Sequence, residues 1–204
     1  MATITLYIAD INLGLKRTKF LLENVNEEQK KKALSYAYEN DQVRSLLSSY
    51  LQNQLAEEEI KKNEMGKPYL ENGPYFNISH SDQFVVMAVS EAEVGVDTEG
   101  IKERDMSSLH RIFNEAEAKM LNDHADFYFL WCAKESLIKC VGSSINKIKE
   151  VPSLPLNGLK TYKGQDYQVK TFIYEKHVIS ITRLGKEEFD IKYERINKLP
   201  YRLN

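Results

Sequence analysis

The amino-acid sequence predicts an α+β protein built from two similar lobes. Residues 26–99 have the pattern of two helices followed by strands, and residues 107–194 again have helices followed by strands. Of 204 residues, 42% are hydrophobic and 28% charged, which is enough for one sizeable core or two fused small ones. We therefore predict lobes over residues 1–100 and 101–204, each with helices on a small antiparallel sheet, and one ligand site between them.

Charge and cysteine content narrow the class of protein. The net charge of −2 argues against a nucleic-acid partner. No apolar run approaches the roughly 18 residues needed to span a membrane, and Met1–Ile8 alternates like a strand rather than resembling a signal peptide. Cys132 and Cys140 would lie on one helix with roughly 12 Å of rise between them, too far for a disulfide. These features predict a reduced, cytoplasmic protein without a membrane partner.

The first half begins with a strand at Thr3–Ile8, whose isoleucines and leucine share one face. Asn26, followed by two glutamates, is typical of a helix start, and this helix is predicted to run to about Tyr38. A second helix is predicted from Asp41. Its apolar residues recur at helical spacing and are Val43, Leu46, Leu47, Tyr50, Leu51 and Leu55.

The remainder of the first half predicts strands. Phe76–Ser79 alternates apolar and polar residues, so a short strand is predicted to end in a polar loop that contains His80. Phe84–Ser90 is almost wholly apolar, which is typical of a strand covered on both faces. Because only a short turn separates it from Val94–Glu99, we predict that these two strands form a hairpin.

The second half is first helical and then extended. Short helices are predicted at Ser107–Phe113 and at Asn114–Leu121, the latter beginning with a capping box. A longer helix, Phe127–Val141, is predicted to be capped by Asp126 and ended by a glycine. The tail after Arg195 is predicted to be loosely ordered. Three strands of a meander are predicted before it: Tyr167–Tyr174, His177–Thr182 and Glu188–Tyr193.

The strand Val94–Glu99 gives the first chemical signal. Its alternation places Asp97 and Glu99 on one face, roughly 7 Å apart, while Val94 and Val96 point into a core. Two such carboxylates can bind a hard cation such as Mg²⁺, which prefers oxygen ligands and often shares them with phosphate. Taken alone, a solvated acidic strand end is the simpler interpretation.

A second signal lies on the helix Phe127–Val141, where Glu135 and Lys139 share a face. In isolation they would form an ordinary surface pair. Across the interface between the lobes, however, Glu135 would add a third carboxylate to Asp97 and Glu99. Acidic residues that hold a metal, surrounded by basic ones, describe a site for a pyrophosphate or polyphosphate. The residues that would supply cations or donors are Arg44, Lys67, His80 and Lys139.

Four motifs that occur in order over residues 26–142 resemble one family. They are Gly66-Lys67-Pro68, Phe76-Asn77-Ile78-Ser79-His80-Ser81, Gly95-Val96-Asp97-Thr98-Glu99 and Trp131-Cys132-Ala133-Lys134-Glu135-Ser136-Leu137-Ile138-Lys139. Together they are similar to the 4′-phosphopantetheinyl transferases of the surfactin-synthetase-activating (Sfp) type. The C-terminal third is supported by length and pattern alone.

The resemblance implies a pseudo-twofold α+β fold with coenzyme A in the cleft between the lobes, complete in a monomer. It also implies a Mg²⁺-dependent reaction. A serine hydroxyl of an apo acyl, peptidyl or polyketide carrier protein attacks the phosphate that bears the pantetheine arm, and adenosine 3′,5′-bisphosphate leaves. The alternatives that stay open are a non-catalytic paralogue that binds coenzyme A or a nucleotide, and a metal-dependent phosphohydrolase.

The resemblance assigns roles residue by residue. Asp97, Glu99 and Glu135 become Mg²⁺ ligands, and Glu135 also accepts the serine proton, directly or through a water. Lys139 stabilises or protonates the leaving phosphate. The residues implied to bind coenzyme A are Lys32, Arg44, Lys67, Pro68, Ser79, His80 and Lys139. The chain departs from the family at Thr98, where an aliphatic residue is usual, and a hydroxyl on that core-facing side needs a partner. It also lacks the proline-containing pattern after Asn26, on which the assignment of Lys32 depends.

Overall fold

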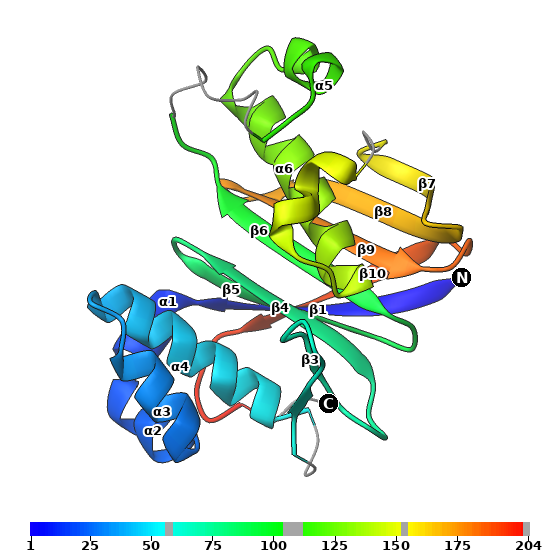
Figure 1. Ribbon diagram of the computed structural model, residues 1–204. Helices are drawn as coiled ribbons and strands as arrows, with labels where there is room; N and C mark the ends of the chain where they lie inside the picture. Colours follow the sequence, from blue (N-terminus) through cyan, green and yellow to red (C-terminus); the bar gives the residue numbers. More distant parts are fainter. Residues whose placement is uncertain (56–58, 104–111, 152–154, 202–204) are drawn as a thin grey trace.

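Two four-stranded sheets, stacked face to face, form the centre of the computed structural model, which describes residues 1–55, 59–103, 112–151 and 155–201 (Figure 1). Helices α1–α4 cover the outer face of the first sheet and α6 covers the outer face of the second. The result is a mixed α+β protein with four layers. Among the described residues, no helix is both long and apolar enough to cross a membrane.

The first sheet has the order β10 (Phe189–Ile196), β1 (Ala2–Asp10), β5 (Phe84–Ser90), β4 (Tyr75–Ser81). The second has the order β6 (Val94–Gly100), β9 (His177–Leu184), β8 (Gln165–Tyr174), β7 (Asn157–Tyr162). A small ribbon pairs β2 (Lys61–Lys62) with β3 (Pro68–Tyr69). The helices are α1 (Ile11–Leu15), α2 (Thr18–Glu23), α3 (Glu27–Leu34), α4 (Glu39–Asn53), α5 (Glu115–Met120), α6 (His124–Val141) and the 3₁₀ helix η2 (Ile145–Glu150).

The core between the sheets is built from alternate residues of the central strands. Ile4, Leu6 and Ile8 of β1 face the second sheet, whereas Tyr7 and Ala9 face the helices. The prediction that Phe84–Ser90 is covered on both sides is confirmed, because its successive residues alternate between these two cores. Each fully buried aliphatic side chain contributes roughly 1.5–3 kcal/mol, so both sheets are held by apolar burial on their inner faces.

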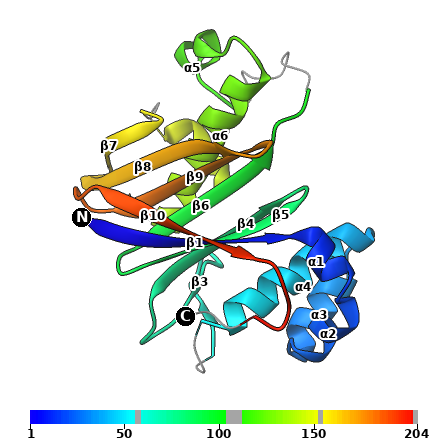
Figure 2. The same cartoon turned by 180° about the vertical axis from the view of Figure 1, so that it is seen from behind.

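Two predicted strand pairings are wrong for the same physical reason. β5 is already paired on both edges, by β1 and β4, so β6 cannot join it and pairs antiparallel with β9 instead. β9 is then paired on both edges, by β6 and β8, so the third strand of the predicted meander cannot join it. That strand, β10, runs parallel to the remaining edge of β1, as Figure 2 shows.

Several element boundaries also differ from the predictions. His80 lies within β4 rather than in a loop after it. Helix α6 is capped by Asp123, whose side chain accepts a hydrogen bond from the Asp126 N–H at 2.9 Å, so Asp126 is not the cap. The predicted end at Gly142 and the capping box at Asn114 are confirmed. The predicted helix at 107–113 falls largely outside the described residues.

The C-terminal segment is ordered further than predicted. β10 extends to Ile196, and Leu199 is buried in the core beneath helix α4. The Tyr201 N–H donates a hydrogen bond to the Tyr50 hydroxyl at 3.0 Å. The prediction of a loose tail after Arg195 is therefore wrong at least through Tyr201.

Gly95 allows helix α6 to cross strand β6 at very short range. A Cβ atom at Gly95 would lie 2.0 Å from the Ser136 carbonyl oxygen and 2.3 Å from the Cys140 nitrogen, both backbone atoms of α6. Two residues further along β6, Asp97 lies on the same face and therefore also points at this helix. The absence of a side chain at Gly95 thus sets how closely α6 approaches Asp97.

We expect Gly95→Ala to destabilise the protein by about 3 kcal/mol or more, because backbone atoms of α6 would have to move away from β6. Chemical denaturation measures the change, and near-UV circular dichroism reports the displacement of Trp131 on α6. Stability within about 0.5 kcal/mol of the original protein would contradict this account of the crossing.

Thr98 lies on the face of β6 that is turned toward the core between the two sheets. It is 1% exposed, and its hydroxyl has no hydrogen-bond partner among the described residues. The predicted core-facing orientation is confirmed, since Val94 and Val96 on the same face belong to the core between the sheets.

We expect Thr98→Val to raise the free energy of unfolding by about 1 kcal/mol, because a buried hydroxyl without a partner is replaced by a methyl group of similar shape. Urea denaturation measures it. Thr182→Val is the matched control and should destabilise, because the Thr182 hydroxyl lies 2.7 Å from Ser136 Oγ in a buried hydrogen bond. A loss of stability in Thr98→Val would contradict the expectation.

Candidate functional site

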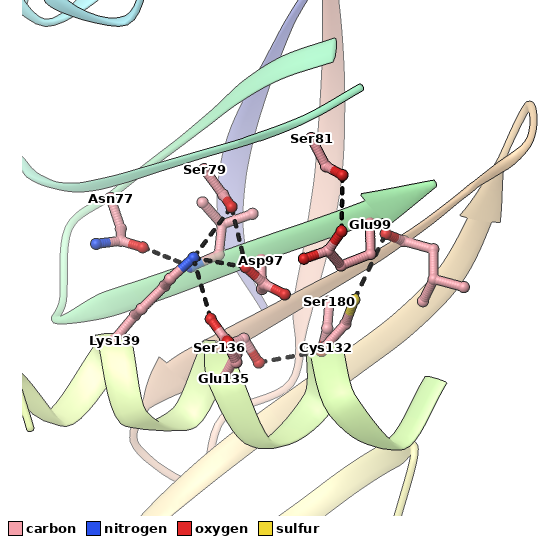
Figure 3. A network of polar contacts seen from close by, with 12 residues as sticks. Asn77, Ser79, Ser81, Asp97, Glu99, Cys132, Glu135, Ser136, Lys139 and Ser180 are labelled. Atoms are coloured by element: carbon pink, nitrogen blue, oxygen red, sulfur yellow. Dashed lines mark hydrogen bonds and ion pairs between the residues drawn. The ribbon is translucent and has the colours of Figure 1, made fainter. Parts of the chain in front are cut away.

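The edges of the two sheets meet along a seam between β4 and β6, and polar side chains connect the two strands (Figure 3). Every second residue of β4 faces β6, in the order Asn77, Ser79, Ser81. Four hydrogen bonds between described residues cross the seam: Val96 N–H to Asn77 Oδ1 (2.9 Å), Ser79 Oγ to Asp97 Oδ1 (2.9 Å), Ser81 Oγ to Glu99 Oε2 (2.7 Å) and Gly100 N–H to Ser81 Oγ (3.4 Å). The seam therefore holds both acidic residues of β6 in place.

Lys139 extends from α6 into this seam. Its Nζ atom lies 2.5 Å from Asp97 Oδ1, 3.0 Å from Ser79 Oγ and 3.6 Å from Glu135 Oε2. Burial lowers the pKa of Lys139, but the Asp97 and Glu135 carboxylates outweigh it and raise the pKa overall. The ammonium group consequently stays charged and joins β4, β6 and α6 at one point.

The acidic residues repel one another. Burial raises the pKa of the Glu135 carboxyl to about 7, and the Asp97 and Glu99 carboxylates add to this, whereas Lys139 opposes it. Burial also raises the pKa of Glu99, against the hydrogen bond from Ser81. Three carboxylates with a single ammonium among them leave an excess of negative charge, so the site favours binding of a further cation.

The residues fit a magnesium ion by the chemistry of their donors. Asp97 Oδ2 is buried and has no hydrogen-bond partner within the described residues, so one carboxylate oxygen is left for a ligand. Mg²⁺ takes a few carboxylate oxygens and keeps several waters. The described part of the chain contains no preformed cluster of three His, Cys, Asp or Glu side chains that would hold a metal. Instead, Lys139 lies between Asp97 and Glu135.

A pocket of about 320 Å³ opens over the seam. The structure brings most of the predicted residues to its walls, namely Lys32, Ser79, His80, Asp97, Glu99, Glu135 and Lys139. They come from α3, β4, β6 and α6, so both halves of the chain contribute. Desolvation by the surrounding protein lowers the pKa of His80, and the nearby cations Arg44, Lys139 and Lys32 lower it further.

Three predicted residues lie elsewhere. Arg44 donates to the Asp82 carbonyl at 2.6 Å and forms an ion pair with Asp41 at 2.5 Å, which ties α4 to the β4–β5 turn. Lys67 forms an ion pair with Glu93 and donates to the Cys140 carbonyl at 2.9 Å. Lys67 and Pro68 line an adjoining pocket of about 200 Å³, which shares Lys139 with the first.

Sequence reasoning missed two sets of polar residues at the site. Asn77 and Ser81 belong to the seam, and their alternation with Ser79 was a usable signal. A polar stripe on α4 lines the pocket with residues Ser45, Ser48, Ser49 and Gln52. Their spacing of three, four and seven residues places them on one helical face, opposite the apolar stripe that packs in the core. We call this set the α4 polar stripe.

Carboxylates, cations and a histidine line one pocket where two sheets meet, and such a set of side chains is suited to an enzyme that acts on phosphate groups. Two family models match the chain. The one described as the 4′-phosphopantetheinyl transferase superfamily matches residues 93–183, and the one described as the N-terminal part of a 4′-phosphopantetheinyl transferase matches residues 15–92.

Similar proteins support the same family. The 4′-phosphopantetheinyl transferase gsp of Aneurinibacillus migulanus is 34% identical over 173 residues, which are 78% of this chain and 69% of that protein. The 4′-phosphopantetheinyl transferase Sfp of Bacillus subtilis (strain 168) is 30% identical over 185 residues, 82% of this chain and 80% of that protein. The chain belongs to the 4′-phosphopantetheinyl transferase superfamily, and it is an enzyme of the transferase class.

We expect Glu135→Gln to stabilise the metal-free protein above neutral pH. The raised pKa of Glu135, about 7 against an ordinary 4.5, means that ionising this residue opposes folding. Its destabilising effect is absent below the ordinary value, grows as the pH rises and is complete above about 7. At pH 8 the variant should gain on the order of 1–3 kcal/mol, and at pH 4 almost nothing.

Urea denaturation at both pH values, with a chelator present, measures this difference. Glu188→Gln, at an exposed position before β10, changes the net charge equally and should show no such pH dependence. Added Mg²⁺ should stabilise the original protein more than Glu135→Gln. Equal stability of the variant and the original protein at pH 8 would refute the electrostatic interpretation.

Proposed function

We propose that this enzyme transfers the 4′-phosphopantetheine arm of coenzyme A to a serine of an apo acyl, peptidyl or polyketide carrier protein and releases adenosine 3′,5′-bisphosphate. The observation that carries the proposal is the meeting of Lys139, Asp97 and Glu135 at the seam. Family membership supplies the reaction, and this cluster supplies side chains that the reaction needs.

Glu135 and Lys139 have complementary roles in the proposed step. The serine oxygen forms a bond to phosphorus, the bond from phosphorus to the pyrophosphate oxygen breaks, and the serine proton moves to Glu135. A carboxylate whose pKa lies near 7 is suited to accept a proton at neutral pH. Lys139 neutralises the charge that develops on the leaving phosphate.

Asp97, Glu99 and Glu135 are the proposed ligands of Mg²⁺, which would supply positive charge for the pyrophosphate when bound. Lys139 would then turn from Asp97 toward the phosphate. Lys32, Ser79 and His80 are proposed to bind coenzyme A because they line the same pocket.

Lys67, Pro68 and Arg44 do not line the main pocket, so different roles are proposed for them. Lys67 and Pro68 would contact the part of coenzyme A that reaches the adjoining pocket, which shares Lys139 with the main one. Arg44 would act through its positive charge, which already lowers the pKa of His80.

We also propose that the molecule consists of two lobes and acts as a monomer. Lobes over residues 1–100 and 101–204, related by a pseudo-twofold, would act as one unit with the active site between them. Each lobe contributes one strand to the other's sheet, since β6 pairs with β9 and β10 with β1. A monomer suffices, because one chain supplies every proposed residue. Cys132 and Cys140 are buried free thiols, which agrees with the predicted reducing cytoplasm.

With coenzyme A, Mg²⁺ and a panel of apo carrier proteins, mass spectrometry should show one phosphopantetheine added to a carrier. Omission of the carrier separates the alternatives, since a phosphohydrolase would still release pantetheine phosphate and a non-catalytic binder would do neither. No mass gain with any carrier in a broad panel would count against the transferase.

Asp97→Asn should lower the transfer rate at least about 100-fold, because a carboxylate charge at the seam is lost while the shape is kept. The rate of holo-carrier formation measures it. Asp190→Asn, at an exposed position on β10, is the matched control and should leave the rate unchanged. An undiminished rate in Asp97→Asn would sink the assignment of Asp97.

A further inference from the structure

Ser48 carries a buried hydroxyl that the rest of the described protein does not bond. The residue is 7% exposed, and its Oγ has no hydrogen-bond partner in the part of the chain that the structure describes. It nevertheless lines the same pocket as Asp97, Glu135 and Lys139. A buried hydroxyl in this position opposes folding unless a ligand provides its partner.

Helix α4 does not need this hydroxyl for its own structure. Serine forms helices less readily than alanine, and the opposite face of α4 already supplies the core contacts through Leu47, Tyr50 and Leu51. The α4 polar stripe extends on both sides of Ser48, and Ser49 and Gln52 also line a neighbouring polar pocket of about 390 Å³. The α4 polar stripe therefore forms a continuous wall that begins at the seam and extends along both pockets.

Charge indicates which part of the substrate lies on this wall. Lys32 lines both pockets together with Ser49 and Gln52, and Lys139 stands at the seam end. Beyond the pyrophosphate, the nucleotide half of coenzyme A carries a further phosphate, whereas the pantetheine arm is uncharged. In the outer pocket Lys62 is paired with Glu28, and Glu59 is also present, so the remaining positive charge lies toward the seam, at Lys32 and Lys139. The half of coenzyme A that carries the further phosphate is therefore the one that fits the seam end of this wall.

We propose that the Ser48 hydroxyl donates a hydrogen bond to an oxygen of the adenosine 3′,5′-bisphosphate half of coenzyme A, and so helps to determine substrate affinity. This inference rests on the proposed function. Ser48 is a binding residue in this account, and it takes no part in proton transfer.

Ser48→Ala tests the inference by isothermal titration calorimetry in Mg²⁺ buffer with three ligands: coenzyme A, adenosine 3′,5′-bisphosphate and 4′-phosphopantetheine. The variant should bind the first two about three- to tenfold more weakly, the usual effect of one hydrogen bond, and the third unchanged. KM for coenzyme A should rise by a similar factor with kcat nearly constant. Without ligand, the variant should melt at a higher temperature than the original protein.

Ser90→Ala is the matched control. Ser90 is equally buried, but its Oγ accepts a hydrogen bond from the Ala92 N–H at 3.2 Å. This variant should lose thermal stability and keep its affinity for all three ligands. The two variants thus separate a hydroxyl that serves a ligand from one that serves the fold.

Each other outcome overturns the inference. Unchanged affinity of Ser48→Ala, equal weakening of all three ligands, or weakening of 4′-phosphopantetheine alone would each refute it while the transferase stands. If the original protein neither binds coenzyme A nor modifies a carrier, the proposed function fails and the inference fails with it.

Discussion

The ion pair between Lys139 and Asp97 is the contact on which the site depends. It joins a residue of α6 to a residue of β6, and Ser79 of β4 bonds to both partners. The pair forms only because Gly95 lets the helix backbone lie directly on the strand. The packing of α6 against β6 therefore determines the position of the Lys139 ammonium group, because the closest approach of the helix to the strand decides how far this group reaches into the seam.

The sequence predicted most elements but not the partners of two strands. Periodicity and capping signals located β1, β5, β6, α4 and α6, because these signals are local. Strand pairing depends on which edges remain open, and that depends on residues far away in the chain. β5 and β9 each have both edges occupied, so β6 and β10 change sheets. A short turn favours a hairpin only when the neighbouring edge is available.

The candidate site could also be predicted only in part, because the sequence shows which residues share a face of one element but not which elements come into contact. The alternation in β6 and the four-residue spacing in α6 gave the shared faces of Asp97 with Glu99 and of Glu135 with Lys139. Neither pattern contained the contact between β6 and α6. Lys67 and Arg44 matched basic positions in sequence, yet acidic partners, Glu93 and Asp41, bind them in the structure. Asp41 stands three residues before Arg44 on α4, a spacing that is visible in the sequence, whereas Glu93 is 26 residues from Lys67 and comes near it only in the fold.

Within the described part of the chain, buried polar side-chain atoms without a hydrogen-bond partner occur both at the site and away from it, where they include the two ring nitrogens of His177. Among the described residues, Asp97 Oδ2 and Ser48 Oγ are buried without partners, and both belong to residues that line the pocket. Thr98 Oγ1 is also buried without a partner, but it lies on the strand face turned toward the core between the sheets. All three atoms are closed to solvent, but a ligand in the pocket would lie beside Asp97 and Ser48, whereas Thr98 does not line this pocket. The same physical penalty is therefore recoverable on one face of β6 and permanent on the other, and this difference separates a binding feature from a packing defect.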